Sequence, residues 1–444
     1  MMRAHLSRQL FAGIALATAV NLAQAPASSA ATDNPDQVLE WNQIFIDTLI
    51  ATNTPNSSSQ RLGAIVHTAI FDAYNGIERR YTPIFVHSSP PRGASRRAAV
   101  IAAAYTALIG LFPPDRFPLQ RAELDASYAT SLAALSDDED EDGGQSRERG
   151  IAWGTEVAQA VLAWRANDGF NATYPAFRGG TAVGQWRPTP PALASMSAQG
   201  LAFTLPFVVA GPEQFRPGSP RSFSTTTYIE DFNAVKALGR TTGSTRTEDQ
   251  TALAPFWEGN ASVHWNQAAN QIARANHLSM SQNNRLFALL NLAMADTAVT
   301  TWSAKRYYGA IDTEVTWRPV TAIVLADTDG IPETTPDLDW MSFVTTPAHP
   351  EYPAGHPSQN GAAATVLLSY FDDAQTFTLT TRLSGVDLPP RSYISISEAR
   401  TDGNNARVWG GMHYPSTVAI SDKMGEAIAN YVDLIAMRPV TESR

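Results

Sequence analysis

The sequence predicts an all-α protein of packed helical bundles with a long Pro/Gly-rich covering loop. Three observations lead to this prediction. Apolar residues recur at helical spacing in one segment after another, alternating strand-like stretches are sparse, and one long segment of different composition interrupts the helices. The chain has 444 residues, of which 44% are hydrophobic and 17% charged. This is typical of a globular protein with either one large domain or two.

The first part of the chain contains five predicted helices. In the segment 36–52, Val38, Trp41, Phe45 and Leu49 share one face. Ser95 is a favourable N-cap for the third helix. The other four predicted helices span residues 61–77, 95–112, 118–135 and 147–168.

The composition changes between Gly169 and Ser222, where Pro, Gly and aromatic residues accumulate. A loop of this length is either disordered or functional, and its aromatic residues favour an ordered cover that shapes access to a pocket. Helical patterns resume with TYIEDFNAVKALG. Thr247 and Gln250 then form a capping-box pattern before TALAPFW. The segment 284–302 is apolar on most faces, which predicts a buried central helix.

The N-terminus has the features of a secretory signal peptide. A basic start, MMRAHLSRQ, precedes an apolar stretch at 10–23 and small residues at 28–30. The apolar stretch is short for a membrane span, and no later segment is long and apolar enough to be one. We therefore expect a secreted or periplasmic protein without a membrane span. The expected organisation is a signal peptide at 1–30, an N-terminal helical region at 31–246 that includes the cover at 169–222, and a C-terminal core at 247–444.

Charge and cysteine content exclude several kinds of function. The formal net charge is −10 and there are no cysteines. Disulfides, thiol chemistry and cysteine metal sites are therefore excluded. An acidic protein is a poor general partner for nucleic acid. If the protein binds an anion, a local cluster of cations must hold it.

The first candidate site is the stretch PAGHPSQNGAAA, which contains His356. Pro357 suits the first turn of a helix, and Gly355 lets the backbone come close to a ligand. Free N–H groups at a helix N-terminus bind anions. A histidine beside a bound anion can transfer a proton near neutral pH.

Two further stretches supply cations and a second histidine. In NNARVWGGMHYPS, Arg407 offers a planar fork of donors to oxyanion oxygens, and His413 is a candidate nucleophile or metal ligand. In WSAKRYYGAIDTEVTWRP, Lys305 and Arg318 add two positive charges.

Taken in this order, the motifs Lys…Arg-Pro, Pro-x-Gly-His and Arg-x5-His resemble those of the superfamily that joins vanadium-dependent haloperoxidases with type 2 phosphatidic acid phosphatases. The stretches WNQIFIDTLIAT, VHTAIFDAYNGIERRY, GQWRPTPP and DFNAVKALG resemble its secreted bacterial haloperoxidase-like branch. The resemblance covers nearly the whole mature chain. It implies an all-α fold of two helical bundles with the oxyanion pocket in the C-terminal half.

The resemblance also implies a role for each candidate residue. Vanadate and phosphate have the same tetrahedral shape and similar charge, and either would be held by Lys305, Arg318, Arg407 and the N–H of Gly355. His413 would bind axially, as the ligand of vanadium in a peroxidase or as the nucleophile that forms phosphohistidine in a phosphatase. His356 would be the acid–base group, acting on hydrogen peroxide or on a leaving alcohol.

Three positions depart from the family pattern. Twelve residues separate Lys305 from Arg318, more than in the family, so residues 309–314 must loop out if Lys305 is to reach the anion. Ala354 replaces the serine of the motif, which removes a hydroxyl hydrogen bond worth roughly 1.5–3 kcal/mol to a charged partner. Thr417 replaces an aspartate that would orient the imidazole of His413, and Thr417 can at most hydrogen-bond that ring.

His349 is a candidate for tuning halide choice. It lies seven residues before His356 in HPEYPAGH. The resembling chloroperoxidases have a phenylalanine here, and the algal bromoperoxidases a histidine. A partly protonated imidazole would make the halide site more polar, which favours bromide and iodide over chloride. Alternatively, His349 only caps the turn through a ring nitrogen.

Three functions remain open at this point. The first is a vanadate-dependent haloperoxidase that uses hydrogen peroxide to oxidise bromide or iodide to hypohalous acid, which then reacts with a small organic acceptor. The second is a secreted acid phosphatase with a phosphohistidine intermediate. The third is a non-catalytic oxyanion-binding protein. The upstream resemblance and the lack of membrane helices favour the first, and a homodimer is compatible with it.

Overall fold

Helices dominate the computed structural model, which describes residues 36–135 and 144–440. The predicted signal peptide at 1–30 lies outside these residues. The first helices are α1 (Gln37–Ala51), α2 (Asn56–Glu78), α3 (Arg96–Leu111), α4 (Pro118–Ala133) and α5 (Gln145–Arg165). They confirm the five predicted segments. Helix α2 begins at Asn56 rather than at residue 61, because the Asn56 Oδ1 atom accepts hydrogen bonds from Gln60 Nε2 (2.8 Å) and from the distant Ala261 N (2.9 Å).

The later helices carry the three candidate motifs. They are α6 (Thr226–Leu238), α7 (Glu248–Phe256), α8 (Ala261–Ala275), α9 (Met280–Tyr308), α10 (Pro319–Val324), α11 (Gly355–Tyr370), α12 (Ile396–Trp409) and α13 (Pro415–Ile435), together with the 3-10 helices η2 (Gln199–Phe203) and η3 (Ala326–Thr328). The capping box of Thr247 and Gln250 is formed at the start of α7.

Strands are short and peripheral to the bundles. Strand β1 (Phe377–Leu379) pairs antiparallel with β4 (Arg391–Tyr393), and β2 (Arg382–Leu383) pairs antiparallel with β3 (Val386–Asp387). In register, Phe377 lies opposite Tyr393 and Arg382 opposite Asp387. Because the strands form only these two short ribbons and helices make up the bundles, the prediction of an all-α fold is confirmed.

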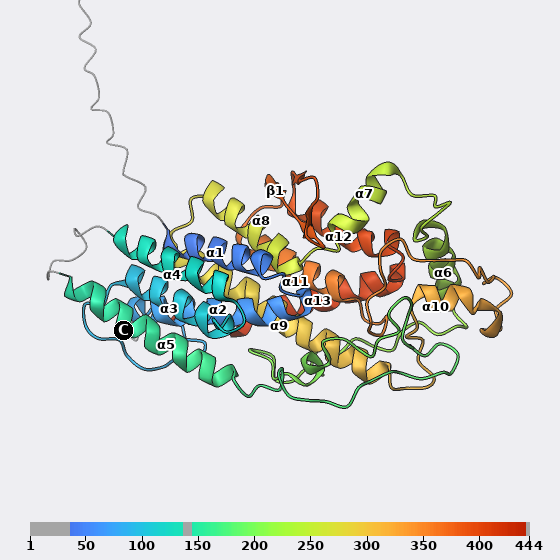
Figure 1. The fold of residues 1–444 in the computed structure, drawn as a ribbon, viewed down its shortest axis with the longest axis horizontal. Coiled ribbons are helices and arrows are strands. Elements are labelled where there is room, and N and C mark those ends of the chain that lie inside the picture. The colour runs from blue at the N-terminus through green and yellow to red at the C-terminus, as the bar shows by residue number, and fades with distance from the viewer. Residues whose placement is uncertain (1–35, 136–143, 441–444) are drawn as a thin grey trace, which may run out of the picture. The chain divides into compact units, whose positions relative to one another are not determined.

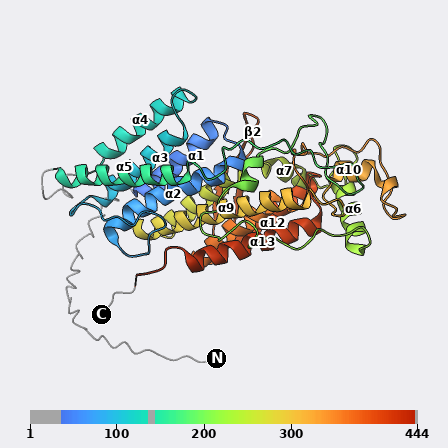
Figure 2. The ribbon, with the colours of Figure 1, turned by 90° about the horizontal axis from the view of Figure 1, so that it is seen from below.

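Helix α9 is the central element on which the site is built. With 29 residues it is roughly 43 Å long, and most of its side chains are buried, as predicted for 284–302. It packs against α2 and also against α11 and α13. Figure 1 shows it running from the α1–α5 group into the α11–α13 group, and Figure 2 shows it alongside α13. Helices α2, α3 and α5 pack together, as do α11, α12 and α13, so two bundles share one central helix.

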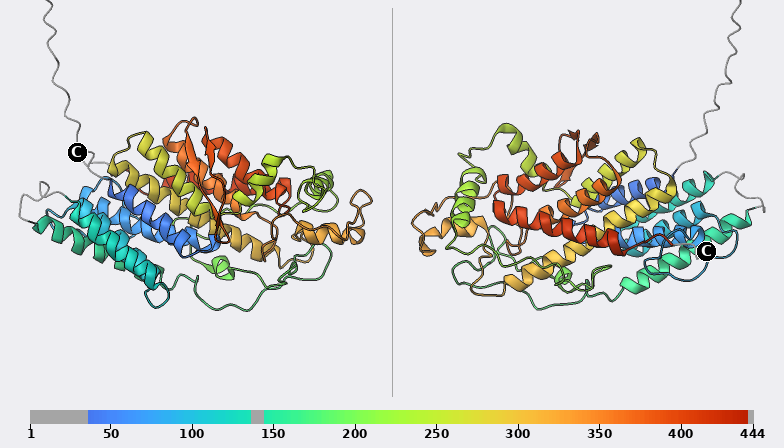
Figure 3. Two further views of the ribbon diagram at one scale, coloured as in Figure 1. Left: turned by 45° about the horizontal axis from the view of Figure 1, so that its top comes forward. Right: turned by 180° about the vertical axis from the view of Figure 1, so that it is seen from behind.

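The Pro/Gly-rich segment at 169–222 is an ordered cover fixed to α9, and its course can be followed in Figure 3. Asp296 of α9 accepts hydrogen bonds from three consecutive backbone N–H groups, those of residues 207–209, at 2.6, 2.8 and 2.9 Å. The indole N–H of Trp302 donates to the carbonyl of Ser197 at 3.3 Å. Trp186, which is fully buried, packs with Trp302 in one apolar cluster. The cover is therefore tied to the same helix that carries Lys305.

No helix in the described part of the chain combines the length and the apolar character that crossing a membrane requires.

Candidate oxyanion-binding site

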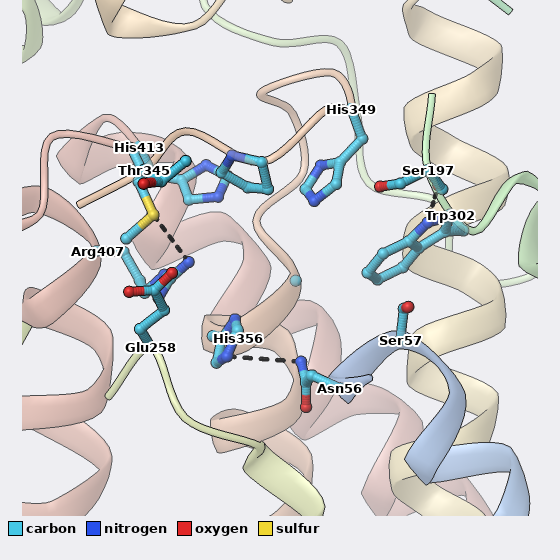
Figure 4. A pocket seen from close by; sticks show the side chains of 13 residues that line it. Asn56, Ser57, Ser197, Glu258, Trp302, Thr345, His349, His356, Arg407 and His413 are labelled. Carbon is cyan, nitrogen blue, oxygen red and sulfur yellow. Dashed lines mark hydrogen bonds between the residues drawn. The ribbon is translucent and has the colours of Figure 1, made fainter. Parts of the chain in front are cut away.

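A cavity of about 200 Å³ lies at the N-terminal end of α11. Five of the predicted site residues line it: His349, Gly355, His356, Arg407 and His413. Figure 4 shows His349, His356, Arg407 and His413 arranged around one space. Other lining residues are Asn56, Ser57, Ser197, Glu258, Trp302, Thr345, Pro347 and Met412. Within the cover at 169–222, Ser197 is the one lining residue, so the prediction that aromatic residues of the cover shape the pocket is wrong. Trp186 packs against α9, whereas Phe207 contacts Trp164 of α5 and Phe215 contacts Tyr431 of α13.

The N-terminus of α11 presents backbone donors at the cavity. Gly355 is the first helical residue, and the preceding Ala354 provides no side-chain cap. The first N–H groups of α11 therefore have no capping side chain, as an anion site requires. A Cβ atom at Gly355 would meet only Trp302, at ordinary contact distances of 3.4 and 3.5 Å. Protein packing does not demand a glycine here, but close approach of a ligand to the backbone does.

A tight turn between α12 and α13 brings Arg407 and His413 together. Gly411 has φ +78° in this turn, and a Cβ there would lie 2.3 Å from the carbonyl oxygen of Gly239, so only glycine fits. Arg407 donates to the carbonyl of Trp257 (3.3 Å) and to Met412 Sδ (3.1 Å), while its buried Nε has no hydrogen-bond partner. Burial lowers the pKa of Arg407 to about 10, so it remains a cation. Its unused donor is available to an oxyanion.

Arg318 lies behind the cavity wall and links two of the three cavity histidines, His349 and His413. Its Nη1 lies 3.1 Å from His413 Nε2, and its Nη2 lies 2.8 Å from His349 Nδ1. It also donates to the carbonyl oxygens of His349 (2.9 Å) and Met412 (2.8 Å). Burial lowers its pKa to about 9, which leaves it protonated at neutral pH.

Lys305 joins the same cluster in spite of the longer spacing to Arg318. It lies in the last turn of α9, Arg318 is the N-cap of α10, and residues 309–314 loop out between the two helices. Its Nζ donates to the carbonyls of Pro350 (2.6 Å) and Glu351 (3.1 Å). Burial, with the nearby Arg318 charge, lowers the pKa of Lys305 well below its ordinary value. Like Arg318, it does not line the cavity but holds the loop that does.

The contacts of His413 fix which of its ring nitrogens carries the proton. An arginine has only donors, so Nε2 of His413 must accept the hydrogen bond from Arg318. The other nitrogen, Nδ1, lies 2.8 Å from Glu351 Oε1 and donates to it. The lone pair is therefore on Nε2, which is the arrangement that a metal ligand or a nucleophile needs. Burial lowers the pKa of His413 well below its ordinary value, so the ring is neutral.

Glu351 is the site residue that sequence reasoning missed. Its carboxylate also accepts from Tyr414 N (3.2 Å) and from Thr417 Oγ1 (3.0 Å). Thr417 was expected to hydrogen-bond His413 at most; it bonds Glu351 instead. The carboxylate that the family places at position 417 is thus supplied from the loop before α11. The missing acid at 417 was the signal that another acid should be sought, and Glu351 lies inside HPEYPAGH.

His349 and His356 are neutral, each with one defined free nitrogen. Nδ1 of His349 accepts from Arg318, so its proton is on Nε2, and the 3.3 Å contact of Nδ1 with the Pro350 carbonyl is not a hydrogen bond. Burial and the adjacent Lys305 lower the pKa of His349 well below its ordinary value. The prediction that His349 is partly protonated near neutral pH is therefore wrong. In His356, Nε2 donates to the Gly259 carbonyl (3.1 Å), which leaves the lone pair on Nδ1.

Positive charge exceeds negative charge in this cluster. Lys305, Arg318 and Arg407 are almost fully buried, and Glu351 is the carboxylate buried among them in the part of the chain that the structure describes. Burial raises the pKa of Glu351 to about 7, against the opposing effect of Arg318 and Lys305. Because isolated buried charges are costly, this excess of cations is stabilised when an anion enters.

Glu258 supplies a negative charge at the cavity itself, and we expect it to weaken anion binding as pH rises. Burial raises its pKa, and the Arg407 charge opposes that rise. The neutral form therefore persists above the ordinary pKa, and the carboxylate that appears at higher pH repels an oxyanion. We expect Glu258→Gln to bind vanadate more tightly than the wild type, by a ratio that grows as pH rises and reaches roughly 3–10-fold at pH about 8. Calorimetric titration at several pH values measures the ratio of the two affinities; a ratio that does not change with pH contradicts the prediction.

The fold and this site together define a class: a helical-bundle protein with a buried, cation-rich pocket and one histidine whose Nε2 lone pair accepts from an arginine. Residues 285–442 match the family model of the VCPO second helical-bundle domain. These residues contain Lys305, Arg318 and all the motif residues that follow them. The match supports the vanadium haloperoxidase superfamily for this C-terminal part of the chain.

Similar solved structures extend the match to the whole fold. A bacterial vanadium-dependent iodoperoxidase aligns with a TM-score of 0.74 at 19% identity, over 92% of this chain and 98% of its own. A bacterial vanadium-dependent chloroperoxidase aligns in its holo form with a TM-score of 0.65 at 19% identity, over 85% of this chain and 90% of its own. Its apo form gives a TM-score of 0.64 at 20% identity, over 85% and 93% of the two chains. Among curated proteins, no sequence matches the chain.

Proposed function

We propose that this protein is a vanadate-dependent haloperoxidase that oxidises bromide and iodide with hydrogen peroxide. The observation that carries the proposal is a neutral His413 whose Nδ1 donates to Glu351 and whose Nε2 accepts from Arg318, with Lys305 and Arg407 buried nearby. The iodoperoxidase and chloroperoxidase that share the fold support this choice over a phosphatase. The segment at 1–30 would export the chain, and 247–444 would be the catalytic core, with 31–246 as the supporting helical region.

The residues present fit vanadate. The unpartnered Nε of Arg407, the uncapped N-terminus of α11 and the open space beside Gly355 offer donors to its oxygens. Arg318 and Lys305 would offset its charge, and His413 Nε2 would be its protein ligand. Bound vanadate would supply an acidic centre that activates hydrogen peroxide for attack by halide.

The side chains around the cavity have separate tasks in this reaction. His356 can take a proton from hydrogen peroxide at Nδ1, because its Nε2 proton is held by the Gly259 carbonyl. His349 offers an Nε2–H donor at the cavity, with its ring held by Arg318 and packed 5.3 Å, centroid to centroid, from Trp302. Glu351 keeps the His413 proton on Nδ1 throughout. Trp302 and Met412 line the cavity beside these polar groups.

An acid phosphatase is the second candidate function. The arrangement of Nε2 in His413 would suit nucleophilic attack on a phosphate ester equally well, and Glu351 could stabilise the charge that develops on the ring. His356 would then protonate the leaving alcohol. Vanadate and phosphate would compete for one site, so one protein sample should show one activity at a time.

One experiment separates these functions. The vanadate-free protein is assayed with a phosphate ester, and then with vanadate, hydrogen peroxide and bromide or iodide. Halide oxidation that appears only after vanadate is added supports the proposal. Phosphate release that vanadate inhibits supports the phosphatase. If the protein binds vanadate but shows neither activity, it is a non-catalytic oxyanion-binding protein.

His349→Phe tests the proposed halide preference. We expect the wild type to oxidise bromide and iodide with little or no chloride turnover, because the His349 N–H keeps the halide site polar and hydrogen-bonded. The phenyl ring should remove this donor and shift the profile toward chloride. Halogenation of a dione reporter with each halide at matched pH is the measurement. Robust chloride turnover by the wild type, or an unchanged profile in the variant, would contradict the assignment.

A further inference from the structure

A second cavity, of about 630 Å³, adjoins the oxyanion cavity at Thr345, which lines both. Its volume is in the range of pockets that bind small organic molecules. One wall is formed by Pro188, Pro190 and Pro191 of the cover. The opposite walls are α10 and the segment 338–346. The motif WRPTPP of the cover, which the anion site does not use, thus has a place at this second cavity.

The cavity surface is mainly apolar and is open at its rim. Its apolar residues from α10 and from the segment after η3 are Val320, Val324, Leu325, Leu338, Trp340, Met341 and Phe343. Leu338 is 76% exposed and Met341 65% exposed. Exposed apolar surface costs about 25 cal/mol per Å² in water, and here it is concentrated beside a hollow rather than scattered. An apolar molecule that covers this surface is therefore stabilised.

Charged groups contribute little to recognition in this cavity. Among the described lining residues, Arg187 is the one that carries charge. Its Nη2 donates to the carbonyls of Thr181 and Ala182, both at 2.9 Å, so its guanidinium holds the cover in place. No carboxylate lines the cavity within the described residues. An uncharged ligand is thus favoured over an ionic one.

The walls of this cavity continue into the oxyanion site. Helix α10 begins directly after Arg318, which contacts both His349 and His413. The segment 338–346 leads through Thr345 and Pro347 to His349. The two cavities therefore lie next to each other along this segment, with Thr345 in the lining of both.

We propose that this cavity binds the organic molecule that accepts the halogen, and that this acceptor is an uncharged aromatic or enolic compound with a nucleophilic carbon. The inference rests on the proposed haloperoxidase function, which supplies hypohalous acid. A ring carbon attacks the halogen, so a carbon–halogen bond forms as the halogen–oxygen bond breaks. The electron pair of that bond leaves with hydroxide, and the ring carbon loses its proton to hydroxide, which forms water.

The test uses 1-naphthol, an uncharged aromatic that can be brominated at either of two ring carbons. The variant Leu338→Asp/Met341→Asp places two charges at the exposed rim, and Leu119→Asp, at a position that is 81% exposed on α4, is the matched control. Binding of 1-naphthol to the vanadate-free protein is measured by calorimetry. With vanadate, peroxide and bromide, the ratio of the two bromonaphthols is compared with that from free hypobromite. Iodide oxidation without any acceptor is measured in parallel.

We expect 1-naphthol to bind the wild type and the control equally, and the double variant at least about tenfold more weakly. The wild-type product ratio should differ from that of free hypobromite and should return to it in the double variant, with iodide oxidation unchanged. Equal ratios for the wild type and the free reagent, with iodide still oxidised, overturn the acceptor site alone. If the double variant binds 1-naphthol as tightly as the wild type does, the acceptor site is likewise overturned. Absence of all halide oxidation overturns the proposed function, and the acceptor assignment with it, even if 1-naphthol binds.

Discussion

Vanadate binding should fall by more than about 100-fold when His413 is replaced by alanine. The His413 Nε2 lone pair would be the protein's direct bond to vanadium, whereas the arginines and the α11 N–H groups only contact its oxygens. The imidazole is also held from both sides, by Glu351 and by Arg318. Calorimetric titration of the vanadate-free protein with vanadate measures the effect.

The control for this prediction is His87→Ala, since His87 is exposed and outside the cavity. It should bind vanadate as the wild type does. Thermal unfolding of both variants shows whether the fold is intact, because His413 is buried and its loss leaves a small void. Unchanged vanadate affinity in a folded His413→Ala protein would end the coordination model.

Glu351→Gln should weaken vanadate binding by about 10–100-fold, the usual effect of losing the partner that orients a metal-ligating histidine. The amide keeps the volume and can still hydrogen-bond, but it removes the charge that holds the His413 proton on Nδ1. Since burial raises the pKa of Glu351 to about 7, its carboxylate form prevails above that pH. The difference in vanadate affinity between the wild type and Glu351→Gln should therefore grow from pH about 6 to about 8. Calorimetric titration with vanadate at several pH values is the measurement.

A second substitution separates orientation from mere packing at Glu351. Thr417 donates to Glu351 at 3.0 Å, and the resembling family has an aspartate at this position. In the Glu351→Gln background, Thr417→Asp returns a carboxylate next to the imidazole and should recover most of the lost affinity. Two results together would show that Glu351 has only a structural role. The folded double variant would fail to recover vanadate affinity, and the affinity difference between the wild type and Glu351→Gln would not change with pH.

Local sequence patterns were sufficient to predict most of the helices and the part of the site at the N-terminus of α11. The start of α11 at Gly355, the capping box at Thr247 and the buried α9 all depend on neighbours in sequence, and each was predicted. Helix α8 was not predicted, and the start of α2 was placed late because Asn56 is stabilised by the distant residue Ala261. The start of α2 depends on a tertiary partner that propensity does not report, whereas α8 has a local N-cap, Asn260, that the sequence analysis overlooked.

The charges in the site were the least predictable part. That His349 is neutral follows from its burial beside Lys305 and Arg318, and neither residue is near it in sequence. Glu351 was overlooked because an isolated acid between His349 and Gly355 has no motif of its own. Its role appears only when the turn after α12 brings His413 and Thr417 to it.

The eight-residue loop from His349 to His356 has a consequence for how such enzymes can change. It carries the proposed halide contact, the carboxylate that orients His413, the first N–H of α11 and the acid–base histidine. Arg318 and Lys305 clamp its backbone at three consecutive carbonyls, those of residues 349, 350 and 351. Substitutions within it should be strongly epistatic, because Arg318 contacts the His349 ring and also His413, whose other ring nitrogen bonds Glu351. Halide specificity is then more readily exchanged by transplanting the whole loop than by single mutations.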